Sequence, residues 1–228
     1  MLAIISFLLL LISYPVYLSY LGSELYGIWA FFSIIISLSQ VGELGINESL
    51  IKYIASSYNE NNKKEVTQYA TSYLVIFCVL VITISLLIGV FRNTIIESVS
   101  IPIQYSQLAR ELLLFTSIML IFIIIGNTLK GIVSAIGRID YSNYTFLWLR
   151  IVQVVLAIIL LFLNYGIWSL LISNFTFYSL NILFLHKFLT KRGINYFKLS
   201  LFSFKKFKTI FSLGSSILIS RLSQKFFI

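Results

Sequence analysis

The stretch SYLVIFCVLVITISLLIGVF at residues 72–91 contains no charged residue and is predominantly apolar around the whole of a helix. About 20 such residues are enough to cross the hydrocarbon core of a bilayer, which is roughly 30 Å thick. A transmembrane β-strand would instead alternate apolar and polar residues over about ten positions. Because a backbone in lipid satisfies its hydrogen bonds only within helices or a closed barrel, this stretch predicts an all-α integral membrane protein.

The composition of the whole chain agrees with this prediction. Only 11% of the 228 residues are charged, and the mean hydropathy is +0.95. About a quarter of the residues are charged in a typical soluble domain. We expect six membrane spans and the start of a seventh, near 2–21, 25–51, 70–91, 111–135, 146–164, 166–186 and from 209 onwards.

These spans suggest three parts of the chain. We expect a six-helix membrane lobe at residues 1–190, a basic cytoplasmic linker at 191–208, and the first helix of an incomplete second lobe at 209–228. Two external connections, at residues 22–24 and 164–166, are short, and Gly22 in the first of them gives the backbone the freedom to make a tight helical hairpin. No soluble domain is expected.

Basic residues are distributed unequally between the two sides of the membrane. If connections alternate between the sides, one side holds only Arg92 and Arg110, whereas the other holds Lys52, Lys63, Lys64, Lys130, Arg138, Lys187, Lys191, Arg192, Lys198, Lys205, Lys206 and Lys208. Cytoplasmic loops carry such an excess, so the amino terminus is expected in the cytoplasm. The net charge of +9 then reflects topology and contact with anionic lipid headgroups, which argues against nucleic-acid binding.

Two carboxylates interrupt the end of the second predicted span, in SQVGELGINESLIKYIAS at residues 39–56. Counted from Leu25, Glu43 lies about 27 Å along a helix, near the cytoplasmic edge of the hydrocarbon core. Glu48 precedes Lys52 by one helical turn, in the order that favours a local ion pair. Glu43 has no such neighbour on its own helix. Because a buried carboxylate without a partner is costly, Glu43 needs a compensating charge from another helix. We therefore predict a polar layer, acting as a structural clamp or as part of a gate, that contains Glu43, Asn47, Asn127, Lys130 and Arg150.

Two cations in the seventh predicted span suggest a binding site. If this helix starts at Thr209, Arg221 lies about 18 Å along it, near the middle of the bilayer, and Lys225 follows one turn later on the same face. Charges at this depth normally face a hydrated cavity or an anionic ligand. We predict that Arg221 and Lys225 bind substrate. The alternative is that this helix does not insert and that both residues lie at the surface.

The sequence offers little support for an enzyme. The one histidine, His186, lies among basic residues at the end of the sixth span, and no serine is accompanied by an evident base. No His, Cys and Asp cluster has the spacing of a metal site, and no Gly-rich phosphate loop is present. We expect no metal and no other cofactor.

Three motifs resemble one transporter family. YLGSELYGIWA at residues 20–30 resembles the signature that follows the first helix of the O-antigen and polysaccharide flippases, whose superfamily also contains the multidrug and toxic-compound extruders. GELGINESLIKYIAS is similar to the acidic-Leu-Gly pattern of this family, with Glu43 and Gly45 at the matching positions. LKGIVSAIGRIDYSNY resembles its turn between the fourth and fifth helices, with Gly131, Arg138 and Asn143 at the matching positions.

The resemblance implies half of a two-lobe transporter in the bacterial cytoplasmic membrane. Its cargo would be a polyprenyl-diphosphate-linked oligosaccharide, an O-antigen or capsule repeat, moved between leaflets while Arg221 and Lys225 bind the diphosphate. Its partners would be membrane lipids, a polysaccharide polymerase and assembly proteins, with no nucleic acid. The alternatives are a drug/cation antiporter of the same superfamily, which needs an acidic site for its coupling ion, and a truncated fragment that does not transport.

Overall fold

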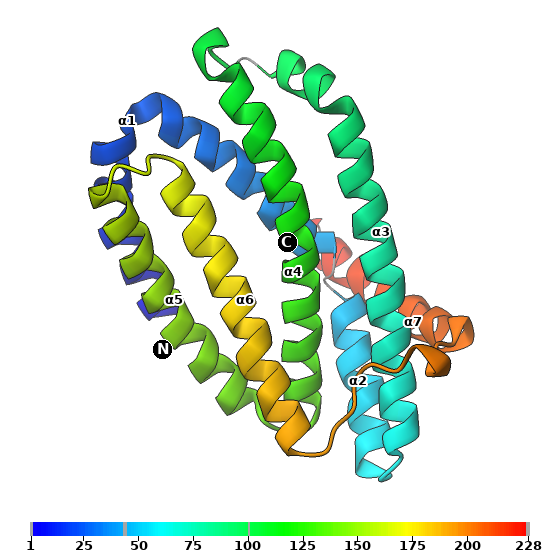
Figure 1. The fold of residues 1–228 in the computed structure, drawn as a ribbon. Helices are drawn as coiled ribbons and strands as arrows, with labels where there is room; N and C mark the ends of the chain where they lie inside the picture. Colours follow the sequence, from blue (N-terminus) through cyan, green and yellow to red (C-terminus); the bar gives the residue numbers. More distant parts are fainter. Residues whose placement is uncertain (1, 43–44, 100, 227–228) are drawn as a thin grey trace. The chain divides into compact units, whose positions relative to one another are not determined.

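The computed structural model describes residues 2–42, 45–99 and 101–226, apart from the side chains of residues 2–4, 6, 10, 38–42, 221, 222 and 224–226. This part of the chain is all-α and contains no strand, which confirms the predicted fold class. The helices are α1 (Leu2–Gly42), α2 (Ile46–Asn59), α3 (Lys63–Ser98), α4 (Ser106–Ala135), α5 (Ile139–Phe162), α6 (Trp168–Lys191) and α7 (Phe204–Phe226), with short 3₁₀ turns at Ile103–Tyr105 and Leu199–Leu201 (Figure 1).

Helix α1 contains the first predicted span and most of the second, and it is broken between them at Gly22. This glycine has φ 72° and ψ 171°, a conformation that is not helical and that residues with a side chain rarely adopt. Figure 1 shows that α1 changes direction within its length. The break confirms the predicted turn at Gly22.

The second predicted span, residues 25–51, ends earlier than expected. Helix α1 ends at Gly42, and a separate helix, α2, begins at Ile46 after Gly45, whose φ is 85°. A left-handed residue cannot continue an α-helix, so Glu48 lies on a different helix from Leu25. The sequence did not reveal this break, because a glycine can either remain helical or end a helix.

Five helices in the described part of the chain are long and apolar enough to cross a membrane: Phe7–Ser37, Lys63–Ser98, Ile103–Ala135, Ile139–Phe162 and Trp168–Lys191. The chain is therefore a multi-pass membrane protein. Helix α7 is not among these five, and it begins at Phe204 rather than at Thr209. Lys205, Lys206 and Lys208, which we assigned to the linker, lie in its first turns.

The chain divides into two compact units, which are described separately. The first unit consists of residues 1–38, 81–122 and 143–181. Its core contains Phe32, Leu112, Leu113 and Leu161, each at most 2% exposed, with Trp29 packed against them. At its surface, Gln104 Nε2 donates a hydrogen bond of 3.0 Å to Glu24 Oε2 beside the α1 break.

The second unit consists of residues 39–80, 123–142 and 182–228. It contains α2, the first part of α3 and all of α7, and α2 packs against α7. Buried residues of this unit include Leu50, Ile54, Tyr73 and Ile210. The candidate sites described next lie mainly here.

Candidate functional site

The predicted substrate residues are only partly described by the structure. Arg221 and Lys225 belong to the backbone of α7, but their side chains lie outside the description. Glu43 also lies outside the described residues. The diphosphate role of Arg221 and Lys225 and the buried charge of Glu43 therefore stay predictions.

Three members of the predicted polar layer lie in the second unit. Asn47 is in the first turn of α2, and Asn127 and Lys130 are half-buried on α4. A Cβ atom built on Gly131 would lie 2.7 Å from Asn47 Oδ1, so the side chain of Asn47 occupies the space that this glycine leaves open. The contact places Asn47 beside the residue that follows Lys130.

Arg150, the fifth member of the predicted layer, lies in the first unit. It is half-buried near the middle of α5, where its Nη1 donates a hydrogen bond of 2.7 Å to Gln153 Oε1. Gln153 is buried, with 6% of its surface exposed. Within its own unit, Arg150 therefore has a polar partner one helical turn away, and its predicted pairing with Glu43 remains a prediction.

Helices α2 and α7 approach each other through two glycines. A Cβ atom on Gly45 would lie 2.5 Å from the carbonyl oxygen of Gly214 and 2.9 Å from the backbone nitrogen of Leu218. A Cβ atom on Gly214 would lie 2.5 Å from Ile46 Cα. The two backbones are thus in direct contact, as at the small-residue interfaces of membrane helices.

The first turn of α3 holds an ion pair with α7. Asn62 caps this helix by accepting a hydrogen bond of 3.2 Å from the backbone N–H of Glu65, and Asn62 Nδ2 donates back to the Glu65 carboxylate. Lys206 Nζ donates to the same carboxylate and also to the hydroxyl of Tyr69 at 3.3 Å. Burial disfavours the charge of Lys206, but these hydrogen bonds outweigh it and raise the pKa of Lys206 above its ordinary value.

The segment between α6 and α7, residues 192–203, is fixed to α3 by hydroxyl groups; we refer to it as the α6–α7 linker. Thr67 Oγ1 donates a hydrogen bond of 2.6 Å to the carbonyl oxygen of Asn195, and Thr71 Oγ1 accepts one of 3.0 Å from the backbone N–H of Lys198. Ser72 Oγ accepts a hydrogen bond of 2.9 Å from the backbone N–H of Ser203. These three α3 hydroxyl residues are buried.

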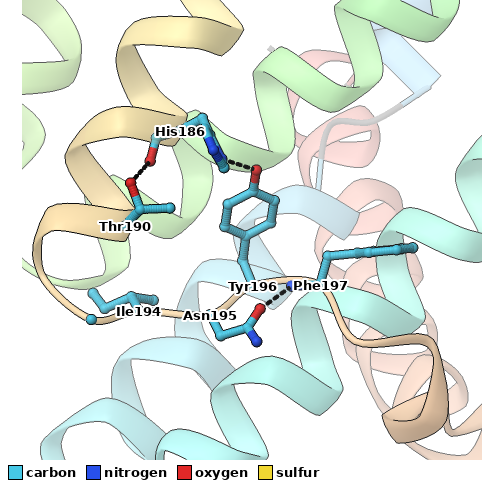
Figure 2. A pocket seen from close by; sticks show the side chains of 7 residues that line it. His186, Thr190, Ile194, Asn195, Tyr196 and Phe197 are labelled. Carbon is cyan, nitrogen blue, oxygen red and sulfur yellow. Dashed lines mark hydrogen bonds between the residues drawn. The ribbon is translucent and has the colours of Figure 1, made fainter.

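A shallow groove lies between the end of α6 and this linker (Figure 2). His186 of α6 and Tyr196 of the linker point toward one another in Figure 2, with His186 Nδ1 2.6 Å from the Tyr196 hydroxyl. Burial raises the pKa of Tyr196. His186 therefore contacts the linker through Tyr196.

A second groove, which we name the α7 groove, runs along α7 where this helix faces α2. It has a volume of about 580 Å³. Its lining consists of one tyrosine, two lysines, three hydroxyl residues and one leucine: Tyr53, Lys205, Lys208, Thr209, Ser212, Leu213 and Ser216. The lining is therefore cationic and rich in hydroxyl groups.

The sequence did not predict the hydroxyl contacts of the linker or the α7 groove. Thr67 and Thr71 are one helical turn apart and thus share a face of α3, but a sequence alone does not say which segment covers that face. The basic residues of the α7 groove were noticed only as topology signals. Among the residues that the structure describes, no group of three or more His, Cys, Asp or Glu side chains could hold a metal ion.

Comparison with family models identifies the family of the chain. The family model described as MatE matches residues 1–159. No curated protein matches the chain.

Solved structures share the fold of this chain. It is similar to the inward-facing conformation of a multidrug resistance MATE family transporter of the MOP superfamily, with a TM-score of 0.73 and 19% identity over 94% of this chain and 50% of that one. For the outward-facing conformation of such a transporter, the TM-score is 0.72 and the identity 18%, over 97% of this chain and 51% of that one.

A third structure, MATE in complex with MaL6, has a TM-score of 0.74 and 18% identity over 99% of this chain and 51% of that one. The chain therefore spans about half the length of these structures and has the fold of half a MATE transporter. Because the MatE model matches most of its residues, the chain belongs to the MatE family.

Proposed function

We propose that the chain is one lobe of a membrane transporter that exports small organic compounds. This was the alternative that the sequence left open as a drug/cation antiporter. The observation that carries the proposal is the MatE match over residues 1–159. It is supported by the shared fold with multidrug resistance transporters in both inward-facing and outward-facing conformations. The proteins of these structures are transporters, in agreement with the expectation that this chain is not an enzyme.

Such a transporter would alternate access by rocking one bundle of helices against another around a site within the membrane. The crossing of α2 and α7 at Gly45 and Gly214 would hold these helices together during that movement. The excess of Lys and Arg on one set of connections supports an orientation with the amino terminus in the cytoplasm.

A second candidate function is the flipping of a lipid-linked oligosaccharide. It is favoured by Arg150, a cation near the middle of α5, because a cation within a span suits a diphosphate better than a cationic drug. In contrast, the carboxylates within the described spans lie near helix ends or beside the α1 break: Glu24, Glu65, Glu97, Glu111 and Asp140. For an antiporter, the remaining candidates for the coupling acid include Glu43 and the half-buried Glu48 of α2, of which we choose Glu43 for the test.

Two assays in parallel distinguish these functions. A full-length, two-lobe version that contains this chain is expressed in a bacterial strain that lacks its main drug exporters, and the accumulation of ethidium is measured with and without an uncoupler. The same full-length version is tested for complementation of a flippase-deficient strain. Export predicts lower ethidium accumulation that the uncoupler reverses, whereas flipping predicts complementation that Arg221→Ala abolishes without loss of membrane insertion.

Glu43→Gln supplies the matched variant for the export assay. If Glu43 binds the coupling ion, this nearly isosteric change raises ethidium accumulation to the level of the empty strain while the amount of protein stays the same. Complementation without ethidium export would replace the proposal by the second candidate. Neither activity in a strain with verified membrane insertion would overturn both.

A further inference from the structure

The first turns of α7 present two different faces side by side. Lys205, Lys208 or Thr209, Ser212 and Ser216 follow one another at the spacing of a single helix face, and they line the α7 groove. Phe204 and Phe211 lie on the neighbouring face and are 65% and 48% exposed. A helix with lysines beside exposed aromatic residues is typical of a segment that lies at a membrane surface.

The linker before α7 continues the apolar surface. Phe197 is 50% exposed, Leu199 65% and Phe202 41%, although each lies within a few residues of a lysine. Exposed aromatic and aliphatic side chains next to lysines match the boundary between acyl chains and headgroups, where both kinds of group are satisfied.

The lysines of the α7 groove differ from their neighbour Lys206. Lys206 is bound to Glu65 and Tyr69. Among the described residues, no carboxylate forms an ion pair with Lys205 or Lys208, and both side chains are exposed. Two cations one turn apart in a concave site thus have their charge available for an anion from outside the chain.

The hydroxyl and aromatic residues that line the α7 groove could contact the uncharged part of such an anion. Thr209 and Ser216 donate hydrogen bonds to backbone carbonyls of α7, so their oxygens remain available as acceptors for a polyol. Tyr53 is held in place by stacking on Tyr69, with 5.2 Å between the ring centroids. Its ring supplies an apolar wall beside the lysines.

We propose that the α7 groove binds the phosphodiester headgroup of an anionic phospholipid. Lys205 and Lys208 hold the phosphate, the hydroxyl groups of α7 accept hydrogen bonds from the glycerol, and Phe204 and Phe211 contact the acyl chains. The site does not depend on what the protein transports, because its contacts come only from α2 and α7.

The test measures lipid binding by native mass spectrometry on the detergent-solubilised chain. The probes are short-chain phosphatidylglycerol, phosphatidylcholine of the same chain length, and inorganic phosphate. The wild-type chain is expected to bind phosphatidylglycerol in preference to the other two. Lys205→Gln/Lys208→Gln is expected to weaken this binding about 25-fold, since a lysine at an anionic lipid surface contributes about fivefold in affinity.

The matched control is Lys63→Gln/Lys64→Gln, which removes the same charge from two exposed lysines at the start of α3, outside the groove. This variant should bind phosphatidylglycerol like the wild type. Because all four lysines are exposed, circular dichroism and gel filtration should show folded protein in every case. Equal weakening in both variants, or equal binding of phosphatidylcholine by the wild type, would overturn the proposal. So would binding of inorganic phosphate as tight as that of phosphatidylglycerol, since it would show a site for free anions.

Discussion

Gly45 at the start of α2 lies against Gly214 of α7 so closely that a Cβ atom on Gly45 would come within 2.5 Å of the Gly214 carbonyl oxygen. A Cβ atom on Gly214 would likewise meet Ile46 Cα. The Gly214 oxygen and Ile46 Cα are backbone atoms, which cannot turn away as a flexible side chain can. The crossing of α2 and α7 therefore depends on the absence of a side chain at both positions.

Gly45→Ala and Gly214→Ala should both lower the stability of the protein. Overpacking costs about 1–3 kcal/mol, and the cost should be higher at Gly45, because its positive φ adds backbone strain. The measurement is the fraction of monodisperse protein that survives heating, followed by gel filtration. Gly27→Ala is the control, since a Cβ atom there meets nothing within 4 Å. If Gly214→Ala is as stable as Gly27→Ala, the close crossing is wrong.

Gly131→Ala should destabilise the contact between α4 and α2, because the new methyl group would meet Asn47 Oδ1. The obstacle is a side chain, so Asn47→Ala should remove it. In a double-mutant cycle, the cost of Gly131→Ala is expected to fall by at least about 1 kcal/mol when Asn47→Ala is also present. Additive effects of the two changes would show that these residues do not touch.

Thr71→Val should loosen the α6–α7 linker. The change keeps the shape of the side chain but removes the hydroxyl that accepts a hydrogen bond from the backbone N–H of Lys198. A buried donor without a partner costs about 1–3 kcal/mol. Hydrogen exchange at the amide of Lys198 should become faster. Thr71→Ser retains the hydroxyl and should protect this amide as the wild type does. Unchanged exchange in Thr71→Val would contradict the described contact.

The ion pair between Lys206 and Glu65 should stabilise the protein up to strongly alkaline pH. The pKa of Lys206 is raised above its ordinary value, so its contribution is fully present below the ordinary lysine pKa and is lost as the pH rises through the higher value of the folded protein. The Tm of the wild type should exceed that of Lys206→Met at pH 7 to 9, and the gap should close only above about 10.4, the ordinary lysine pKa.

Lys205→Met is the control for this prediction, because Lys205 is exposed and forms no ion pair among the described residues. Its Tm should follow that of the wild type across the pH range. A gap between wild type and Lys206→Met that closes already near neutral pH would mean that another group is responsible.

The predicted polar layer can be tested by charge reversal. If the layer exists, Glu43→Lys should reduce the amount of folded protein, since it would add a second cation to the layer. Lys130→Glu or Arg150→Glu in the same chain should partly restore it if the pair exists. The readout is the yield of monodisperse protein after membrane extraction. Failure of both partner changes would remove Glu43 from the layer.

The sequence was sufficient to predict most of the helices, but it did not predict the contacts between them. Uninterrupted apolar runs indicated the spans, and Gly22 was identified as a turn. The break at Gly45 was missed because a glycine can also remain helical, as Gly27 does. The positive φ of Gly45 and the approach of Gly214, far away along the chain, show why this residue must be a glycine.

The start of α7 was misplaced for a related reason. Its first turns contain three lysines, which in a sequence resemble a polar loop, although lysine is a good helix former. Lys206 is stabilised by Glu65, 141 residues earlier. Pairing over such a distance cannot be read from the charge pattern, which indicated only the side of the membrane.

The hydrogen bonds that fix the α6–α7 linker have a consequence for how this protein can diverge in evolution. The linker contributes only its backbone groups at Asn195, Lys198 and Ser203, whereas α3 contributes the side chains of Thr67, Thr71 and Ser72. Substitutions in the linker leave those backbone groups in place, but an insertion or deletion would shift them out of register. We therefore expect orthologues to conserve the length of this segment and the three hydroxyl residues, while linker residues other than Tyr196, whose side chain contacts His186, vary.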